Sequence, residues 1–378
     1  MKVLVLGGCG AQGTFATREL VASDEVSELI IGDYNVERAR RVASEIGSEK
    51  LGVEKVDVRD RGALVDLMRK VDVVVNCVGP FYMYGPMVLS AAIEAGRSYV
   101  DICDDADATV KMLEMNDKAR DAGISAVIGL GASPGITNIL SVYLAREFDR
   151  VDEIRQYWVV DSSSDPEGMA VMYHAAHGMS GRTPQFINGK LEWLKAGSGA
   201  EKVEFLGGKA TVVYFGHPEP ITIPKYVEGV KTVINKGGFL PSSDFTIFRI
   251  LSRLGFFSEK KIAGVSPRRL TVTFLTKTVA KQEMKEATRT AIRLEMTGES
   301  GGETLKLVAH LKGHMGPATG MPAAIGALML INEEVEVKGV LPPEACIDPD
   351  TFIKRARERI EPGAELVLEK TYRGPLFD

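Results

Sequence analysis

The chain opens with the stretch Lys2-Val3-Leu4-Val5-Leu6-Gly7-Gly8-Cys9-Gly10-Ala11-Gln12-Gly13, in which an apolar run passes directly into a glycine-rich turn. Residues 8–13 fit the pattern GxGxxG, and a helical pattern continues from them to Ala22. A strand before this pattern and a helix after it are the context in which the pattern binds a dinucleotide. The first glycine permits a tight turn, the second lets the backbone approach the pyrophosphate, and the third lets the helix pack against the strand. We therefore expect a phosphate loop, with backbone N–H groups and the helix dipole facing the phosphates, made by Gly8, Gly10, Ala11, Gln12 and Gly13.

Short apolar runs alternate with helical patterns over residues 1–130. Several runs, such as Val71-Asp72-Val73-Val74-Val75, lack polar alternation, which is typical of strands buried on both faces. This alternation predicts an α/β domain with a doubly wound parallel sheet of the Rossmann type. The expected strands are Lys2–Leu6, Glu28–Ile31, Leu51–Val56, Val71–Cys77, Arg97–Ile102 and Ile124–Ile128, and the expected helices are Ala11–Ala22, Val36–Ile46, Arg61–Arg69, Pro86–Ala95 and Ala106–Ala122.

The pattern changes after the turn at residues 131–135. Crowded turns and β-branched residues predict a second, α+β domain built on a mostly antiparallel sheet. A Gly- and Ser-rich region, Ser162–Gly199, lies within it. The strand-like runs are Glu153–Val160, Ala210–Phe215, Arg269–Thr276, Ala291–Met296 and Thr304–His310, and the helical patterns are Ile136–Phe148, the buried Met321–Ile331 and the amphipathic Thr351–Arg359.

Composition narrows the class of protein. The 378 residues include 46 Lys and Arg against 51 Asp and Glu, a net charge of −5 that predicts neither nucleic acid nor membrane as a partner. The longest apolar stretches fall short of the roughly 20 residues that span a bilayer, and the apolar start suits a strand better than a secretion signal. Four widely spaced cysteines without a CxxC pair favour a reducing cytoplasm over disulfides or zinc.

Asp33 is the second element of the predicted dinucleotide site. It follows Gly13 by 20 residues at the end of a strand, where an acid binds the adenosine ribose hydroxyls. The alternative is a helix N-terminal acid, since Asn35 can cap the next helix. An acid here favours NAD because it repels a 2′-phosphate, whereas Arg38, Arg40 and Arg41 leave NADP open.

Other strand ends supply further candidates, because ligands of open α/β sheets bind beyond the carboxyl ends of the strands. We expect cofactor contacts from Asn35, Asp57, Val58, Cys77, Val78, Gly79, Pro80, Pro134 and Gly135. Each of these positions also fits an ordinary loop. None of the ten tyrosines has a lysine four residues later, which excludes the Tyr-x-x-x-Lys pair of short-chain dehydrogenases.

Several segments resemble the saccharopine dehydrogenase-like reductases in order and spacing. They read GGCGAQG, GDYNVERA, NCVGPFYMYG, AAIEAGRSYVD, GASPGITN, TGMPAAIGALML and KGVLPPEACIDP. The family includes saccharopine reductases, lysine 6-dehydrogenases and carboxynorspermidine dehydrogenases. The resemblance implies hydride exchange between a nicotinamide and a carbon attached to nitrogen. It also implies a Rossmann domain (1–132), an inserted substrate and dimerisation domain (133–315), and a segment returning to the first domain (316–378).

The resemblance has one departure. The saccharopine-forming reductases usually carry Asp before the Pro-Gly turn and another residue at the position of Asn138, whereas this chain has Ser133-Pro134-Gly135. The turn is closer to the lysine dehydrogenase-like branch, so the family name alone does not give the substrate.

Substrate residues are expected near the strand ends and in the second domain. Tyr82, Tyr84, Tyr99 and Asn138 lie close to the predicted cofactor, although a buried tyrosine can simply pack in the core. Asp101 can hold a cationic amine or act in catalysis, with a helix cap or salt bridge as the alternative. His174 and His217 suit proton transfer near neutral pH, while His177 and Arg182 complete a polar cluster with His174; a structural histidine is the alternative for each.

These observations predict a cytoplasmic, homodimeric NAD(P)-dependent oxidoreductase that acts on the C–N bond of an amino acid or polyamine-like substrate. The protein's task is to align the reacting carbon and to exclude water. A reductase of a carbonyl or C=C bond and a non-catalytic nucleotide sensor are the alternatives, because fold does not decide function. The pairs His174/His177 and His310/His314 lack an HExxH pattern and a third ligand, so no metal is expected.

Overall fold

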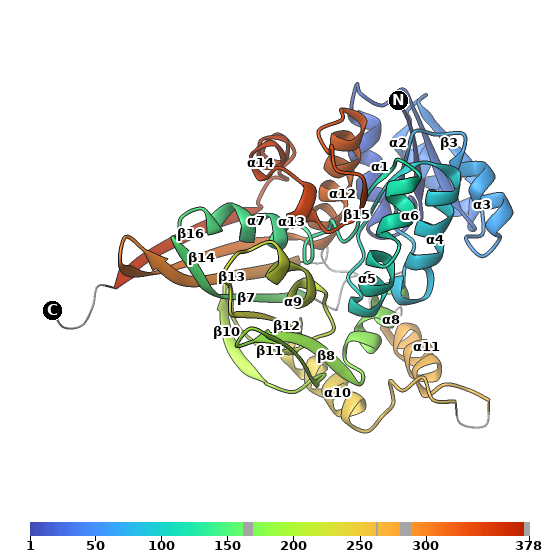
Figure 1. The fold of residues 1–378 in the computed structure, drawn as a ribbon. Helices are drawn as coiled ribbons and strands as arrows, with labels where there is room; N and C mark the ends of the chain where they lie inside the picture. Colours follow the sequence, from blue (N-terminus) through green and yellow to red (C-terminus); the bar gives the residue numbers. More distant parts are fainter. Residues whose placement is uncertain (162–168, 262–263, 280–288, 374–378) are drawn as a thin grey trace. The chain divides into compact units, whose positions relative to one another are not determined.

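The computed structural model describes residues 1–161, 169–261, 264–279 and 289–373 (Figure 1). It comprises two compact units, Met1–Ile139 with Gly316–Ile360, and Leu140–Met315 with Glu361–Asp378. The functional division into 1–132, 133–315 and 316–378 stays a prediction. Among the helices of the described residues, none has the length and apolar character needed to cross a bilayer.

The first unit is built on a seven-stranded parallel sheet in the order β15-β6-β5-β4-β1-β2-β3. Six strands follow the Rossmann order, which confirms the predicted fold class, and β15 extends the sheet beyond β6. Val3 to Leu6 and the whole of β4 are buried, as expected for strands covered on both faces. The strands are β1 Lys2–Leu6, β2 Glu28–Asp33, β3 Leu51–Lys55, β4 Val73–Asn76, β5 Ser98–Asp101, β6 Ser125–Val127 and β15 Gly339–Leu341.

Helices on the first unit begin where the sequence supplies caps. Asn35, Asp60 and Asp348 each accept a backbone N–H at the start of a helix, which satisfies one of its free donors. The helices are α1 Gly13–Ala22, α2 Val36–Ile46, α3 Arg61–Met68, α4 Phe81–Ala95, α5 Ala106–Leu113, α6 Asn116–Asp121, α12 Met315–Ile331, α13 Pro343–Cys346 and α14 Pro349–Arg357.

The single helix predicted over Ala106–Ala122 is wrong, because α5 and α6 divide it. The side-chain oxygen of Asn116, the first residue of α6, accepts the backbone N–H of Val340 at 3.0 Å. This bond ties the start of α6 to the added strand β15, a long-range contact that local periodicity does not reveal.

Helix α12 packs closely on α1. A Cβ atom at Gly320 would lie 2.7 Å from the backbone N of Ala16 and 2.8 Å from the carbonyl O of Gln12. Glycine at this position therefore lets a helix from late in the chain touch the helix that follows the phosphate loop.

The second unit is built on a mixed nine-stranded sheet. Strands follow the order β10-β11-β12-β7-β13-β14-β16, with β8 paired to β12 and β9. Only the β7–β12 pair is parallel among the described strands of this sheet, so the predicted mostly antiparallel character is confirmed. The strands are β7 Arg150–Asp161, β8 Arg182–Ile187, β9 Lys190–Lys195, β10 Glu201–Phe205, β11 Gly208–Tyr214, β12 Thr232–Leu240, β13 Arg289–Ser300, β14 Glu303–His314 and β16 Glu365–Arg373.

Most helices of the second unit lie between these strands in the order of the chain. The Gly- and Ser-rich region lies partly outside the described residues, and the rest of it forms α8, β8 and β9. The helices are α7 Ile136–Ala145, which begins in the first unit, α8 Met169–Gly178, α9 Glu219–Thr222, the 3-10 turn Ile223–Lys225, α10 Ser242–Arg253 and α11 Pro267–Val279.

The strand predicted over Arg269–Thr276 is wrong, because these residues belong to helix α11. Ser266 accepts the backbone N–H of Arg269 at 3.1 Å, and Pro267 occupies the first helical position. Both are helix-starting features, and here they outweigh the β-branched residues that follow.

Candidate functional site

The phosphate loop joins β1 to α1 as the sequence predicts. Gly10 donates its N–H to the carbonyl of Gly7 at 2.9 Å and closes the turn. A Cβ at Gly13 would lie 2.1 Å from the Gly7 oxygen, so the third glycine is required for helix α1 to approach the loop. Gln12, the N-cap residue, makes no side-chain capping bond. Thr14 donates its N–H to the carbonyl of Gly10 at 3.0 Å, so backbone rather than a side chain closes the first turn of α1. The positive end of the helix dipole lies at this turn, as it does at anion-binding helix starts.

Asp33 ends β2, the strand next to β1. Its Oδ1 accepts the N–H of Asn35 at 2.8 Å, and its Oδ2 accepts the thiol of Cys9 at 3.1 Å. Burial and the Asp33 carboxylate raise the pKa of Cys9 to about 12, so the thiol stays protonated and keeps its donor. Cys9 thus orients the carboxylate expected to bind ribose, a contact that the sequence did not reveal.

A cavity of about 650 Å³ opens beside Asp33. It carries two acids and two bases close to the expected adenosine end of the cofactor, so charge there favours neither NAD nor NADP by itself. Its lining consists of Tyr34, Asn35, Val36, Glu37, Arg40, Val53, Glu54 and Lys55.

The ends of β3 and β4 differ in their surroundings. Asp57 is ion-paired with Arg59 at 2.5 Å, and this hydrogen-bonded partner lowers the pKa of Asp57 to about 2. Val58 is buried. The carbonyl oxygen of Cys77 would lie 3.0 Å from a Cβ at Gly7, and Cγ2 of Val78 would lie 3.2 Å from it, so the start of the segment Cys77–Pro80 lies against the phosphate loop. The structure therefore supports this segment, more than Asp57, as a neighbour of the cofactor.

Asp101 and Tyr99 form a buried network at the end of β5. The Tyr99 hydroxyl donates to Oδ2 of Asp101 at 2.7 Å and accepts from the side-chain amide of Asn76 at 2.9 Å. Oδ1 of Asp101 accepts the N–H groups of Cys103 and Gly129 at 3.0 and 2.8 Å. Burial raises the pKa of Asp101 to about 6 despite these bonds. These hydrogen bonds give Asp101 a structural role other than the expected helix cap or salt bridge, while substrate contact by either residue stays a prediction.

The side chain of Asn138 stabilises the Pro134–Gly135 turn. Its Oδ1 accepts the N–H of Gly135 at 3.0 Å, and its Nδ2 donates to the buried carboxylate of Glu344 at 2.8 Å. A Cβ at Gly135, whose φ is +123°, would lie 2.0 Å from the Gly131 oxygen. The turn is thus fixed by its own backbone. Glu344 comes from α13, about two hundred residues later in the chain, which is why sequence reasoning missed it.

The two predicted tyrosines lie at the start of α4. The backbone N–H of Tyr82 donates to Asp105 at 2.8 Å, and Tyr84 packs against the edge of the core. Their proposed contacts with substrate stay predictions. Asp105 is fully buried and was not singled out from the sequence.

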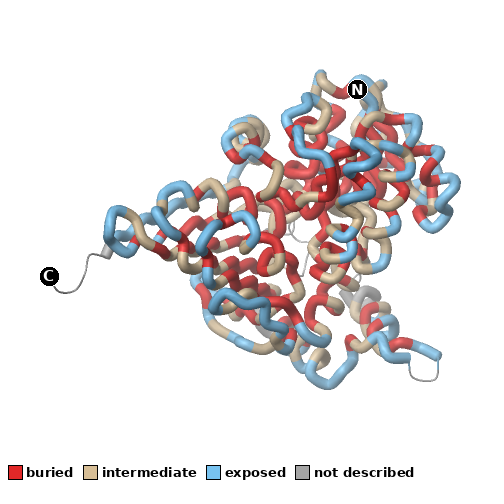
Figure 2. The backbone as a smooth tube through the Cα atoms, in the orientation of Figure 1, coloured by how far each residue is buried: buried red, intermediate tan, exposed pale blue. Residues whose placement is uncertain are grey.

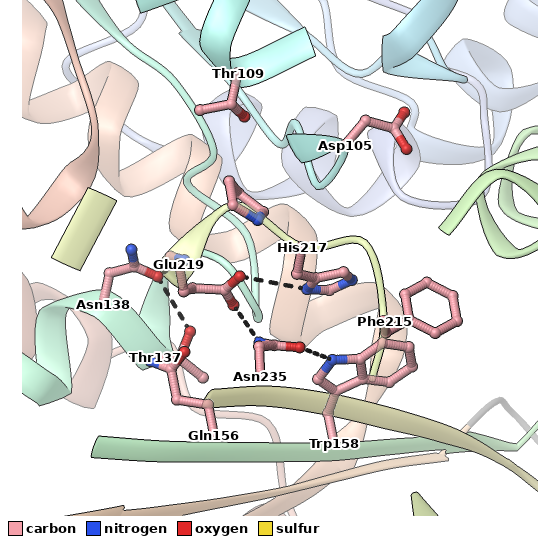
Figure 3. Close-up of polar contacts among 12 residues, drawn as sticks. Asp105, Thr109, Thr137, Asn138, Gln156, Trp158, Phe215, His217, Glu219 and Asn235 are labelled. Carbon is pink, nitrogen blue, oxygen red and sulfur yellow. Dashed lines mark hydrogen bonds and ion pairs between the residues drawn. The ribbon is translucent and has the colours of Figure 1, made fainter. Parts of the chain in front are cut away.

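His217 is the most distinctive polar side chain of the second unit (Figure 3). Its side chain is 4% exposed, and its ring stacks on Trp158 with centroids 4.9 Å apart. Nδ1 lies 3.5 Å from Oε2 of Glu219, an ion-pair distance. Neither ring nitrogen has a hydrogen-bond partner within the described residues. An imidazole with one nitrogen beside a carboxylate and the other unbonded is the arrangement that proton transfer needs.

A chain of hydrogen bonds holds Glu219 in place. Asn235 of β12 donates to Oε1 of Glu219 at 3.0 Å, and Trp158 of β7 donates to Asn235 at 3.1 Å (Figure 3). Glu219 is fully buried at the start of α9. Two neighbouring strands and the loop after β11 therefore fix the carboxylate, and stacking on Trp158 fixes the ring of His217. His217 and Glu219 stand two residues apart in the sequence, and this spacing was the signal for a polar site. Their partners on β7 and β12 could not be recognised from the sequence.

Of the other polar residues predicted for this unit, His174 lies close to His217, whereas His177 and Arg182 have other partners. The ring of His174 lies 5.4 Å from that of His217, so these two candidates come together. His177 accepts from Arg268 at 3.0 Å; arginine has no acceptor, so Nδ1 of His177 is unprotonated in this contact. Arg182 is exposed and donates to the carbonyl of Trp193. Arg268, rather than Arg182, is the arginine next to the α8 histidines.

The first unit resembles a known protein family in sequence. Residues 3–127 match the family described as the saccharopine dehydrogenase NADP binding domain. The likeness to that family is thus established for this segment. The resemblance and the nicotinamide dinucleotide-binding domain expected from the sequence are thereby confirmed.

Relatives of this saccharopine dehydrogenase-type domain match only part of the chain. Carboxyaminopropylagmatine dehydrogenase of Synechocystis sp. is 25% identical over 177 residues, 45% of this chain and 43% of that protein. A saccharopine dehydrogenase-like oxidoreductase of Rattus norvegicus is 27% identical over 225 residues, 55% of this chain and 51% of that protein. The chain therefore matches about half the length of these relatives.

A solved structure shares the whole fold. Apo saccharopine dehydrogenase (L-Glu forming) from Saccharomyces cerevisiae has a TM-score of 0.69 and 16% identity, covering 98% of this chain and 99% of that one. At this identity the likeness establishes the fold alone.

Proposed function

We propose that this protein is an NAD(P)-dependent oxidoreductase that transfers hydride at the C–N bond of an amino acid or polyamine-like substrate. The phosphate loop carries the proposal, because Gly8, Gly10 and Gly13 form a tight turn between β1 and α1 in which an added Cβ would crowd neighbouring protein atoms, as the dinucleotide fingerprint requires. The substrate class follows the names of the relatives, which denote saccharopine and a carboxyaminopropyl amine.

The residues present fit a nicotinamide dinucleotide. Gly8, Gly10 and the N-terminal end of α1 would hold the pyrophosphate, and Asp33, held by Cys9, would accept the ribose hydroxyls. When bound, the cofactor exchanges hydride with the carbon that bears nitrogen. Cys77–Pro80 and the rigid Pro134–Gly135 turn are the backbone segments proposed to orient its nicotinamide end.

His217 is the proposed proton-transfer residue. Its Nε2 takes a proton from the amine nitrogen, or from the water that hydrolyses the imine, and returns it in the reverse direction. Glu219 beside Nδ1 stabilises the charged ring that forms. Glu219 is thus a positioning residue. His174 is the second candidate because its ring lies beside that of His217.

The test follows the absorbance of reduced nicotinamide. The protein is incubated with NAD or NADP and with lysine, saccharopine, other amino acids and polyamines, and in reverse with 2-oxoacids plus amines. Turnover with one amine class supports the proposal. Turnover only with carbonyl or C=C substrates supports the reductase alternative, and cofactor binding without any turnover supports the sensor.

Asp33→Asn tests the preference for NAD. Loss of a charged acceptor for the ribose hydroxyls weakens NAD binding by about 1.5–3 kcal/mol, roughly 10- to 100-fold in Kd, and leaves NADP less affected. Asp66→Asn, which changes an exposed acid paired with Arg69, is the matched control. Equal losses for NAD and NADP would argue against a ribose contact.

We further propose a cytoplasmic homodimer. All four cysteines are free thiols, which suits a reducing compartment. The dimer rests on the family resemblance, and sedimentation velocity of the purified chain tests it.

A further inference from the structure

A stripe of apolar side chains lies exposed along helix α10. Ile247, Ile250 and Leu254 follow at i, i+3 and i+7, a spacing that places them on one helix face, and they are 57%, 50% and 68% exposed. Phe256, in the turn that follows, is 46% exposed. Phe245 and Phe248 are buried on the opposite side. The helix is therefore anchored in the second unit by one apolar face while a second apolar face meets solvent. Figure 2 shows how buried and exposed residues are distributed along the backbone of the described chain.

The same segment is rich in positive charge. Residues 242–275, from the start of α10, contain six Lys or Arg residues and two acids, Asp244 and Glu259, although the whole chain has a net charge of −5. Glu259 pairs with the buried Arg268 at 2.9 Å. The remaining bases, Arg249, Arg253, Lys260, Lys261 and Arg269, form no ion pair with the described part of the chain. A cationic surplus thus flanks the apolar stripe.

Two of these bases already repel each other. Arg249 and Arg253 lie one helical turn apart, and burial together with the charge of Arg253 lowers the pKa of Arg249. An anion between them relieves both the repulsion and the cost of partial burial.

We propose that α10 and the turn after it dock on the surface of an anionic phospholipid bilayer. Ile247, Ile250 and Leu254 enter the boundary between headgroups and acyl chains, while Arg253, Lys260 and Lys261 bind lipid phosphates. The contact is peripheral, since α10 has only 12 residues. A second copy fits less well, because a two-fold interface would set this cationic patch against itself. The net charge of −5 led to the expectation of no membrane partner, because a sum over the whole chain does not show a local excess of positive charge.

The first experiment measures binding of the full chain to vesicles by co-sedimentation. We expect binding to phosphatidylcholine vesicles that contain phosphatidylglycerol and little binding to phosphatidylcholine alone. Lys260→Gln together with Lys261→Gln weakens binding about 25-fold, because each base near the surface contributes about fivefold. Equal binding to both vesicle types, or no binding to either, would overturn the proposal.

The second experiment tests the apolar stripe. Ile250→Ser with Leu254→Ser is expected to reduce binding at least tenfold. The matched control, Leu366→Ser with Leu368→Ser, removes an equally exposed pair from β16 of the same unit and leaves binding unchanged. Circular dichroism verifies that both variants are folded. If the α10 variant instead alters the sedimentation coefficient of the free protein and not vesicle binding, the stripe is a contact between copies and the lipid proposal fails. Both results are independent of the oxidoreductase assay.

Discussion

Single side chains decide the chemistry that this protein can perform, and His217 is the clearest case. Stacked on Trp158 and beside Glu219, it is held in one orientation before any ligand binds. Its neighbours come from β7 and β12, strands about 75 residues apart in the chain. Sequence reasoning therefore found the histidine by its chemistry but not the residues that position it.

Replacing His217 tests its assignment. We expect His217→Gln to lower kcat about 10²- to 10⁴-fold, the usual contribution of a general acid–base group, with little change in cofactor Kd. His310→Gln is the matched control, because His310 is equally buried in the same unit but contacts Arg293 and Glu369. Steady-state kinetics of both variants are compared, and similar losses would point to a structural effect.

Glu219→Gln separates a positioning role from a structural one. Loss of the carboxylate is expected to lower kcat with little change in substrate KM, because the ring of His217 keeps its place on Trp158 but loses the group that stabilises its charged form during proton transfer. Steady-state kinetics measure both constants, and a raised KM together with a lowered melting temperature would contradict the positioning role.

Asp101 makes stability depend on pH in a known direction. Its pKa is about 6 in the folded protein against 3.8 for a free side chain, so the folded state binds the proton more tightly. The resulting stabilisation is complete below pH 4 and is lost as pH rises to about 6, a change of roughly 3 kcal/mol. Urea unfolding between pH 4 and 7 measures it.

Asp101→Asn is the comparison for this measurement. It keeps Oδ1, which accepts the N–H groups of Cys103 and Gly129, but it does not titrate. The difference in unfolding free energy between the two proteins therefore narrows or reverses as pH rises. A constant difference across this range would contradict the raised pKa.

Secondary-structure elements were predictable where local signals agreed. Helix α2 has the bounds expected from its periodicity, since Asn35 caps its start and Gly47 its end. Helix α11 was missed because a Ser-Pro start outweighed β-branched residues, and the α5–α6 break depends on a contact with β15. The bounds of elements that local caps determine can thus be predicted from the sequence, whereas the bounds of elements that distant contacts determine cannot.

The contact between α12 and α1 gives a prediction at this scale. Gly320→Ala forces α12 away from backbone atoms of Ala16 and Gln12, which costs about 1–3 kcal/mol of stability and weakens cofactor binding by displacing the start of α1. Gly62→Ala in α3 is the control, because its Cβ meets nothing closer than 3.7 Å and a helical alanine is stabilising. Thermal unfolding and cofactor titration of both variants check this, and unchanged affinity in Gly320→Ala would refute the coupling.

At the scale of the whole molecule, the fold class followed from the alternation of buried strands and helices. The details of the second unit did not, because its site residues lie on strands that pair across long stretches of chain. The net charge of the whole chain does not show the basic segment around α10, because it is a sum over all residues.

Cofactor binding is expected to stabilise the first unit selectively. At a ligand concentration of about 100 times Kd, mass action adds about 2.7 kcal/mol, which raises the Tm of a unit of this size by roughly 5–10 °C. Differential scanning calorimetry with and without NAD or NADP measures the shift. A shift shared equally by every transition would show that the units unfold together.

The discontinuity of the first unit also governs how the protein is made. Strand β15 and helix α12 leave the ribosome only after nearly all of the second unit has been synthesised. Until then β6 is an open edge, with its backbone groups available to wrong partners. The nascent N-terminal sheet therefore lacks its last strand while most of the neighbouring unit is synthesised, and its open edge is exposed to aggregation or to chaperone binding during that interval.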